Sequence, residues 1–196
     1  EAIAVSPDLL ITRLETLKAI SLDKPLIVIT HLIGYLHFLP TKENYDSKIL
    51  NLEVEMEISR DDLVNKLLLL GYKKETIVTR TGELGVRGFI LDVFPLGEIH
   101  PIRIEFFGDN IESIRTFDEN SQRSLEHKNK ITIYPCTEYL TNELIEANSS
   151  HKTLEDYIEV NSVQDYLNKP IIIYKDPYTI KNVYETTKIE VLDYVK

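Results

Sequence analysis

The stretch "PIRIEFFGDNIESIRTF" (Pro101–Phe117) alternates apolar and polar residues on either side of a Gly108-Asp109 pair. Alternation with a period of two is typical of half-buried strands, and glycine in the first position of a two-residue loop favours a type II′ hairpin turn. That turn would place Phe106 opposite Ile111. Strand alternation then predicts a core face (Ile102, Ile104, Phe106) and an exposed face (Arg103, Glu105, Phe107).

Two runs before this hairpin, "TIVTR" (residues 76–80) and "VRGFILDVF" (residues 86–94), also have the composition of strands and are bounded by turn residues. We therefore expect an antiparallel meander that ends with the hairpin. Within the second run, Arg87 interrupts the apolar pattern. Gly88 has no side chain and indicates a bulge or a bend beside this arginine.

A strand and a helix are expected immediately before the meander. "LNLEVEMEI" (Leu50–Ile58) alternates and predicts a half-buried strand with a solvated glutamate face (Glu53, Glu55, Glu57). Residues Ser59–Leu70 predict a helix, because an acid follows Ser59 at capping-box spacing and Gly71 suits the residue after the helix. "KITIYP" (Lys130–Pro135) is expected to form a further strand after the meander. Together these elements make up an α+β unit.

The flanking segments favour a different architecture. "LIVIT" (Leu26–Thr30) and "PIIIYKD" (Pro170–Asp176) are continuous apolar runs, which is typical of strands buried on both faces. Helices are expected beside them (from Ser6-Pro7 to Ile20, up to Leu39, in part of Thr141–Val160, and over Pro177–Glu185). The fold class predicted is therefore an α/β domain interrupted by an inserted α+β domain with a small antiparallel sheet and a helix.

Charge and composition limit the classes of function. The chain has 22 Lys+Arg against 32 Asp+Glu, a formal charge of −10, which argues against strong non-specific nucleic-acid binding. No run approaches the ~18 apolar residues that a membrane span requires. A single cysteine, Cys136, excludes an intramolecular disulfide and favours a reducing, cytoplasmic setting. The first residue is not methionine, so a segment of a longer protein is expected.

Motifs for catalysis and cofactor binding are not found. The sequence contains no P-loop, no dinucleotide fingerprint and no nucleophile elbow. The five histidines are scattered, so no metal site is predicted. Asp92 lies inside an apolar strand, where a structural bond to a neighbouring arginine or to the backbone is favoured over general-base catalysis. We expect no catalytic residue, no cofactor and no metal in this chain.

Arg87, Arg103 and Phe107 are the candidate binding residues. Arginine and aromatic side chains presented together on a rigid sheet are typical of hot spots in protein interfaces. The alternative is that these are three unrelated surface residues, with Phe107 half-buried under a loop.

The motif from Gly82 to Ser124, "GELGVRGFILDVFP…HPIRIEFFGDNIESIRTFDENSQRS", resembles domain 2 of the bacterial transcription-repair coupling factors (Mfd) and its counterpart in the excision-repair protein UvrB. "TFDENSQRS" is more similar to the coupling factors, and a weaker similarity extends back to "SPDLLITRLETL". Beyond about Tyr139 the resemblance fades.

The resemblance implies a surface that binds UvrA, the damage-recognition ATPase, through Arg87, Arg103 and Phe107. It also implies three parts: 1–49 from a UvrB-like domain 1a, 50–135 as domain 2, and 136–196 as domain 1b. The flanks would be parts of a helicase-like domain that has lost its nucleotide site, so no ATPase activity is expected. RNA polymerase and DNA would be engaged only by parts of the parent protein outside this chain.

Two residues depart from the family pattern. Phe89 stands where the family often has a second glycine, and Leu84 stands where it often has an aromatic residue before Gly85. Either change could alter the fit to the partner. Two other functions remain open: a UvrA-binding segment of UvrB itself, and a nucleic-acid-binding module that uses the same arginines on phosphates.

Overall fold

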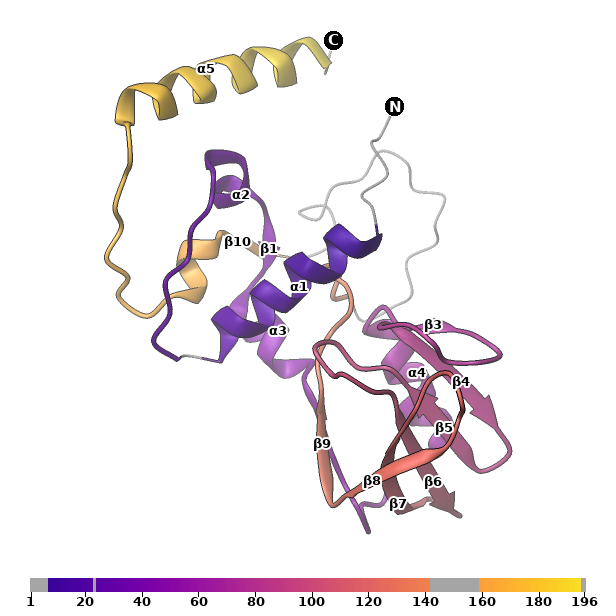
Figure 1. The fold of residues 1–196 in the computed structure, drawn as a ribbon. Helices are drawn as coiled ribbons and strands as arrows, with labels where there is room; N and C mark the ends of the chain where they lie inside the picture. Colours follow the sequence, from indigo (N-terminus) through magenta and orange to yellow (C-terminus); the bar gives the residue numbers. More distant parts are fainter. Residues whose placement is uncertain (1–6, 23, 142–158, 195–196) are drawn as a thin grey trace.

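The computed structural model describes residues 7–22, 24–141 and 159–194 (Figure 1). The N-terminal elements are short and mostly helical: α1 (Pro7–Ser21), α2 (Leu32–Leu36), β1 (Leu39–Pro40) and α3 (Lys42–Ser47). The central elements are β2 (Leu50–Glu53), α4 (Arg60–Leu69), β3 (Lys73–Lys74), β4 (Glu83–Arg87), β5 (Ile90–Val93), β6 (Ile102–Phe107), β7 (Asn110–Phe117), β8 (Ser124–Lys128) and β9 (Lys130–Ile133). The C-terminal elements are β10 (Val160–Asn161), η2 (Val163–Tyr166) and α5 (Pro177–Tyr194).

The central unit is a six-stranded sheet in the order β3-β4-β5-β6-β7-β8, and every neighbouring pair except β3/β4 is antiparallel. The expected hairpin is confirmed: Phe106 pairs with Ile111 and Phe107 with Asn110 around a turn in which Gly108 has φ 61°. Ile102, Ile104 and Phe106 are buried, as the alternation predicts.

A β-bulge in β7 keeps the hairpin's apolar residues on one face. Glu105 pairs with Ser113, but the next residue, Phe106, pairs with Ile111, so Glu112 is an extra residue on β7. Ile111 and Ile114 are three residues apart and would point to opposite faces of a regular strand. Both are buried in the same core cluster because the bulge resets the alternation.

The run "VRGFILDVF" is not one strand, and "TIVTR" is not a strand. β4 and β5 form a second hairpin with Gly88 and Phe89 in the turn, and the positive φ of Gly88 (57°) makes this tight reversal possible. Residues 75–80 form a loop that buries Val78 in a small cluster with Phe94 and Phe117.

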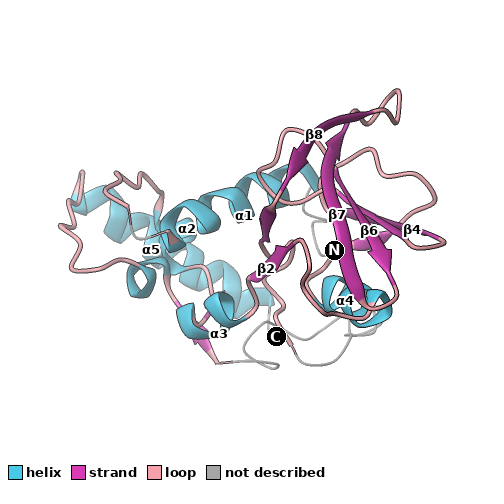
Figure 2. Cartoon of the chain, turned by 90° about the horizontal axis from the view of Figure 1, so that it is seen from below, coloured by secondary structure: helices cyan, strands magenta, loops and turns pink. Residues whose placement is uncertain are grey.

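Helix α4 covers the core face of this sheet (Figure 2). The Ser59 side chain accepts a hydrogen bond from the Asp62 backbone N–H at 3.3 Å, as the capping pattern predicts. Gly71 follows the helix with φ 86°, and a Cβ there would lie 2.6 Å from Cβ of Thr137. Position 71 therefore requires glycine for both its conformation and its packing.

The strand predicted over Leu50–Ile58 is shorter, because Glu55 has a positive φ of 71° and ends it. Before this turn the chain pairs with β9, and after it the Glu55 N–H donates to the carbonyl of Ile111 at 2.8 Å. The segment therefore crosses from one sheet to another. The three glutamates are exposed, as predicted, although they do not share one strand.

The flanking segments differ most from expectation. Neither "LIVIT" nor "PIIIYKD" forms a strand; both are extended, with Ile27 90% and Ile173 85% exposed. A strand needs a neighbour to bond its backbone, and no neighbouring strand meets either run within the described ranges.

The flanking helices also differ from the predicted bounds. α2 ends at Leu36, short of Leu39, whereas α5 extends beyond Glu185 to Tyr194. α1 begins at Pro7 and buries Leu14, Leu17 and Ile20.

Two short strand pairs join the flanks. Leu39 pairs with Asn161 in β1/β10, and Leu50 pairs with Ile133 in β2/β9. In the sequence, both strands of β2/β9 lie between β1 and β10, so the two pairs are nested. The chain segment that enters the central unit therefore runs beside the segment that leaves it. Of the helix expected in Thr141–Val160, residues 142–158 lie outside the described residues. No described helix is long and apolar enough to span a bilayer.

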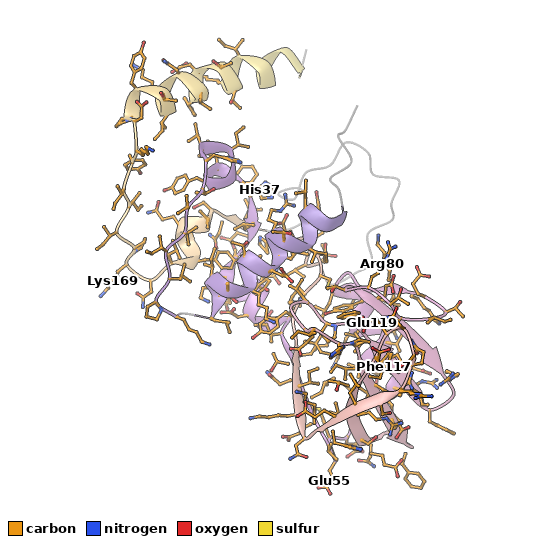
Figure 3. The ribbon with its side chains drawn as sticks, in the orientation of Figure 1. His37, Glu55, Arg80, Phe117, Glu119 and Lys169 are labelled. Atoms are coloured by element: carbon orange, nitrogen blue, oxygen red, sulfur yellow. The ribbon has the colours of Figure 1, made fainter. Side chains whose placement is uncertain are left out.

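A buried carboxylate connects the N-terminal helices to the chain that leaves the central unit. Glu138 is 4% exposed and receives two hydrogen bonds from the Arg13 guanidinium of α1, at 2.7 and 2.8 Å. His37, immediately after α2, places its Nε2 3.1 Å from the second Glu138 oxygen (Figure 3). The carboxylate therefore holds three chain segments together.

We expect Glu138→Gln to lower the free energy of unfolding by about 2 kcal/mol, because hydrogen bonds to a charged group are among the stronger ones in proteins. Urea denaturation followed by circular dichroism measures this change. Glu53→Gln, at an exposed position in β2, is the matched control and should leave the midpoint unchanged. Equal midpoints for the two variants would contradict the role of Glu138.

Candidate protein-interaction site

Arg103, expected on an exposed face, is buried: only 7% of its surface is accessible. The guanidinium forms a two-pronged ion pair with Asp92 on the neighbouring strand, with Nε–Oδ1 and Nη2–Oδ2 distances of 2.7 Å each. The prediction that Asp92 bonds a neighbouring arginine is confirmed, and the prediction that Arg103 is exposed is wrong.

The β7–β8 connection covers the Arg103 side chain. Nη2 lies 3.2 Å from the side-chain oxygen of Gln122, and Nη1 lies 3.4 Å from its carbonyl oxygen. The guanidinium carbon is 4.4 Å from the centroid of the Phe117 ring, a cation–π contact (Figure 3 labels Phe117). The hydrogen bonds to Asp92 raise the pKa of Arg103, so the guanidinium stays charged while it is committed to internal partners.

Arg87 and Phe107, in contrast, are exposed, Phe107 by 76%. Arg87 is the last residue of β4 and pairs with Ile90, and Phe107 is the last residue of β6 and pairs with Asn110. Both residues adjoin hairpin turns at the same end of the sheet, the end near Glu55 in Figure 3. Arg87 makes no ion pair or side-chain hydrogen bond with any residue in the described ranges.

The register separates this sheet end from Arg103 by one row of residues. Asp92 pairs with Arg103, and two residues further along, Ile90 pairs with Glu105. Glu105 accepts hydrogen bonds from Ser113, at 2.8 Å, and from Arg115. The structure therefore brings Arg87 and Phe107 to one end and sets Arg103 behind them as an internal residue.

Phe89 also lies at this end. It occupies the β4–β5 turn, it is 71% exposed, and its carbonyl accepts a hydrogen bond from the Phe106 N–H at 2.9 Å. The sequence singled out Phe89 only as a departure from the family pattern that could alter the fit to the partner. The sequence did contain a signal that Phe89 is exposed: it follows Gly88, a residue typical of turns.

Reactive side chains do not gather in the described part of the chain. No group of three or more histidine, cysteine, aspartate or glutamate residues there could hold a metal ion. Cys136 is buried, and this burial raises the pKa of its thiol to about 11. The thiol is protonated near neutral pH and is a poor nucleophile.

Comparison with known proteins finds a family whose model matches the central unit of this chain. The family model described as the UvrB interaction domain matches residues 50–139, which contain the whole six-stranded sheet and α4. The transcription-repair-coupling factor of Staphylococcus aureus (strain USA300) is 39% identical over 139 residues, which cover 70% of this chain and 12% of that protein. The corresponding protein of Staphylococcus haemolyticus is 29% identical over 236 residues, covering 97% of this chain and 20% of that protein.

The chain thus spans between about an eighth and a fifth of the length of these curated relatives. The match to the UvrB interaction domain coincides with the sheet that carries Arg87, Arg103 and Phe107. This chain belongs to the family of the transcription-repair-coupling factors, and its residues 50–139 are a UvrB interaction domain.

Proposed function

We propose that this chain is a non-catalytic segment of a transcription-repair-coupling factor that recruits UvrA during transcription-coupled nucleotide excision repair. The observation that carries the proposal is the sheet end of the UvrB interaction domain, where Arg87 is exposed and unpaired among the described residues and Phe107 is exposed. Exposed arginine and aromatic residues on a rigid support are the typical anchors of protein interfaces.

Each side chain has a distinct role in this proposal. Arg87 donates charge-assisted hydrogen bonds to a carboxylate of UvrA. Phe107 enters an apolar pocket of UvrA and loses its exposed apolar surface to it. Arg103 contributes as a positioning residue, because its guanidinium is already bonded to Asp92 and Gln122 and joins β6 to β5 behind the contact residues.

The flanking segments complete an α/β domain only in the longer parent protein. On this proposal residues 1–49 belong to domain 1a and residues 136–196 to domain 1b, with domain 2 inserted between them. The nested pairs β1/β10 and β2/β9 support the insertion. The apolar runs Leu26–Thr30 and Pro170–Asp176 ascend in the same direction in Figure 1, as strands of a parallel sheet would.

Two further functions carry less support. A segment of UvrB would share the UvrA contact, but the curated relatives named here are coupling factors. A nucleic-acid-binding module would need a basic surface, whereas the chain has a net charge of −10. Contacts with RNA polymerase and DNA are assigned to other parts of the parent, which would act in the cytoplasm.

The first prediction of this proposal concerns affinity for UvrA. Arg87→Ala and Phe107→Ala should each weaken binding by about 2 kcal/mol, roughly 30-fold in Kd, if each residue is a hot spot. Isothermal titration of the 196-residue chain with UvrA measures this loss.

The non-catalytic role predicts that ATP hydrolysis by the chain alone does not exceed the rate in buffer.

The matched controls for this titration are Arg80→Ala and Leu125→Ala. Both side chains are exposed and lie away from the two turns, Arg80 in the 75–80 loop and Leu125 in β8 (Figure 3 labels Arg80). They should bind like the unmodified chain. An affinity unaffected by Arg87→Ala and Phe107→Ala would show that UvrA binds elsewhere.

A second prediction separates positioning by Arg103 from direct contact. Arg103→Ala leaves Asp92 unpaired in a mostly buried site and should cost about 3 kcal/mol of unfolding free energy, because breaking a buried ion pair is strongly destabilising. Replacing both partners by apolar residues, Arg103→Met with Asp92→Leu, should restore most of this stability.

The UvrA affinity of the double variant decides between the two roles. A positioning role predicts that affinity recovers with stability, to within about threefold of the unmodified chain. If the double variant is as stable as the unmodified chain but still binds as weakly as Arg103→Ala, then Arg103 contacts UvrA directly.

A third prediction concerns the flanks. Ile27→Lys with Ile173→Lys should change the unfolding free energy of the 196-residue chain by less than about 0.5 kcal/mol, since both side chains are exposed. The same changes in the full-length parent should lower its thermal unfolding temperature, because there each lysine would be buried in a sheet. An unchanged parent would contradict the proposed α/β completion.

A further inference from the structure

The two hairpin turns at the Arg87 end of the sheet each carry an exposed phenylalanine. Phe89 follows Gly88 in the β4–β5 turn, and Phe107 precedes Gly108 in the β6–β7 turn. Their exposed fractions are similar, 71% and 76%. A single exposed apolar residue needs no explanation, but two phenylalanines on adjacent turns form an apolar surface of the kind that marks a binding site.

Neither turn requires phenylalanine for its own conformation. The positive φ angles belong to Gly88 and Gly108, and Phe89 is not among the residues with positive φ. Phe89 and Phe107 lie outside both buried core clusters. The rings therefore contribute little to the fold, and exposing them to water has no evident structural benefit.

One short segment holds both turns in place. The Ile58 N–H donates to the carbonyl of Asp109 at 2.7 Å, which fixes the β6–β7 turn. Two residues later, the Arg60 guanidinium donates to the carbonyl of Gly88, which fixes the β4–β5 turn. Asp61 binds the same guanidinium, with a shortest distance of 2.6 Å.

The two turns are also joined directly, through the 2.9 Å hydrogen bond from the Phe106 N–H to the Phe89 carbonyl. The backbones that carry both rings are thus fixed to each other and to the start of α4. Surfaces that are rigid before binding lose less conformational entropy when a partner docks, so more of the contact energy appears as affinity.

We propose that Phe89 is a second aromatic anchor, which acts with Phe107 on one partner surface. The partner surface is an apolar depression wide enough for two phenyl rings, with a carboxylate at its rim facing Arg87. The charge complementarity follows from Arg87, the arginine at this end whose charge no described residue neutralises. This inference rests on the proposed function, in which the partner is UvrA, and it adds a residue that determines how tightly this chain binds.

The test is a titration of the 196-residue chain and its variants with UvrA. Phe89→Ala should weaken binding about 10-fold, the effect of a moderate hot spot. Phe89→Leu, which retains much of the apolar volume, should lose at most about threefold. The matched control is Ile99→Ala, at an exposed residue in the connection between β5 and β6, far from the two turns; its affinity should not change.

Stability measurements accompany the titration. Because Phe89 is exposed and outside the core, the urea midpoint of Phe89→Ala should equal that of the unmodified chain. A loss of affinity at unchanged stability then reports a contact and not a damaged fold. A lowered midpoint would overturn the assignment, because Phe89 would then be a structural residue.

The outcomes distinguish this inference from the proposed function on which it rests. If Arg87→Ala and Phe107→Ala weaken binding but Phe89→Ala does not, the second anchor is wrong and UvrA recruitment stands. If UvrA binds with an affinity that none of the three variants changes, or does not bind at all, the assignment of this surface fails, and the second anchor with it.

Discussion

The ion pair between Arg103 and Asp92 is the interaction on which the proposed binding surface depends. It joins β5 and β6 through two bonds of 2.7 Å on the face of the sheet opposite α4. Phe117 and Gln122 close over the guanidinium, so the pair is largely removed from water. A charge in that position is tolerated because each of its strong donors has an acceptor. The outer face of the sheet is thereby packed around Arg103, and Arg87 and Phe107 lie exposed at the end of the sheet.

The position of these residues at the end of the sheet has a consequence for recognition. Arg87, Phe89 and Phe107 come from strand ends and turns, which are the usual locations for binding residues on a rigid scaffold. Here the turns are held by backbone and side-chain bonds from Ile58 and Arg60 at the start of α4. The same helix buries Leu63 and Leu67 against the sheet. The core and the proposed contact surface are thus connected through a single element.

Much of the central unit could be predicted from the sequence. A two-residue turn that begins with glycine admits one register, so the pairing of Phe106 with Ile111 followed from Gly108. The capped helix over Arg60–Leu69 followed from Ser59. The Gly88-Phe89 turn was missed because Phe89 extends an apolar run where a turn usually carries small or polar residues. Alternation placed Arg103 on the outer face correctly, but periodicity does not reveal which loop folds over that face.

The flanks were mispredicted for a different reason. "LIVIT" and "PIIIYKD" have the composition of strands that are buried on both faces. Such a composition predicts a strand only where neighbouring strands and covering layers are present. In this chain neither run has a neighbouring strand among the described residues, and both remain extended and exposed. The candidate site shows a related limit: the resemblance identified Arg87, Arg103 and Phe107, but only the three-dimensional contacts separate the two exposed residues from the internal one.

The most direct test of the binding surface is hydrogen–deuterium exchange of the 196-residue chain with and without UvrA. Backbone amides covered by a partner exchange more slowly, so the measurement locates the contact without any substitution. Our account predicts slower exchange in peptides that contain residues 87–90 and 107–110, with little change in α5. Unchanged exchange at both turns in the presence of bound UvrA, with protection along α5 or the 170–176 segment, would contradict it.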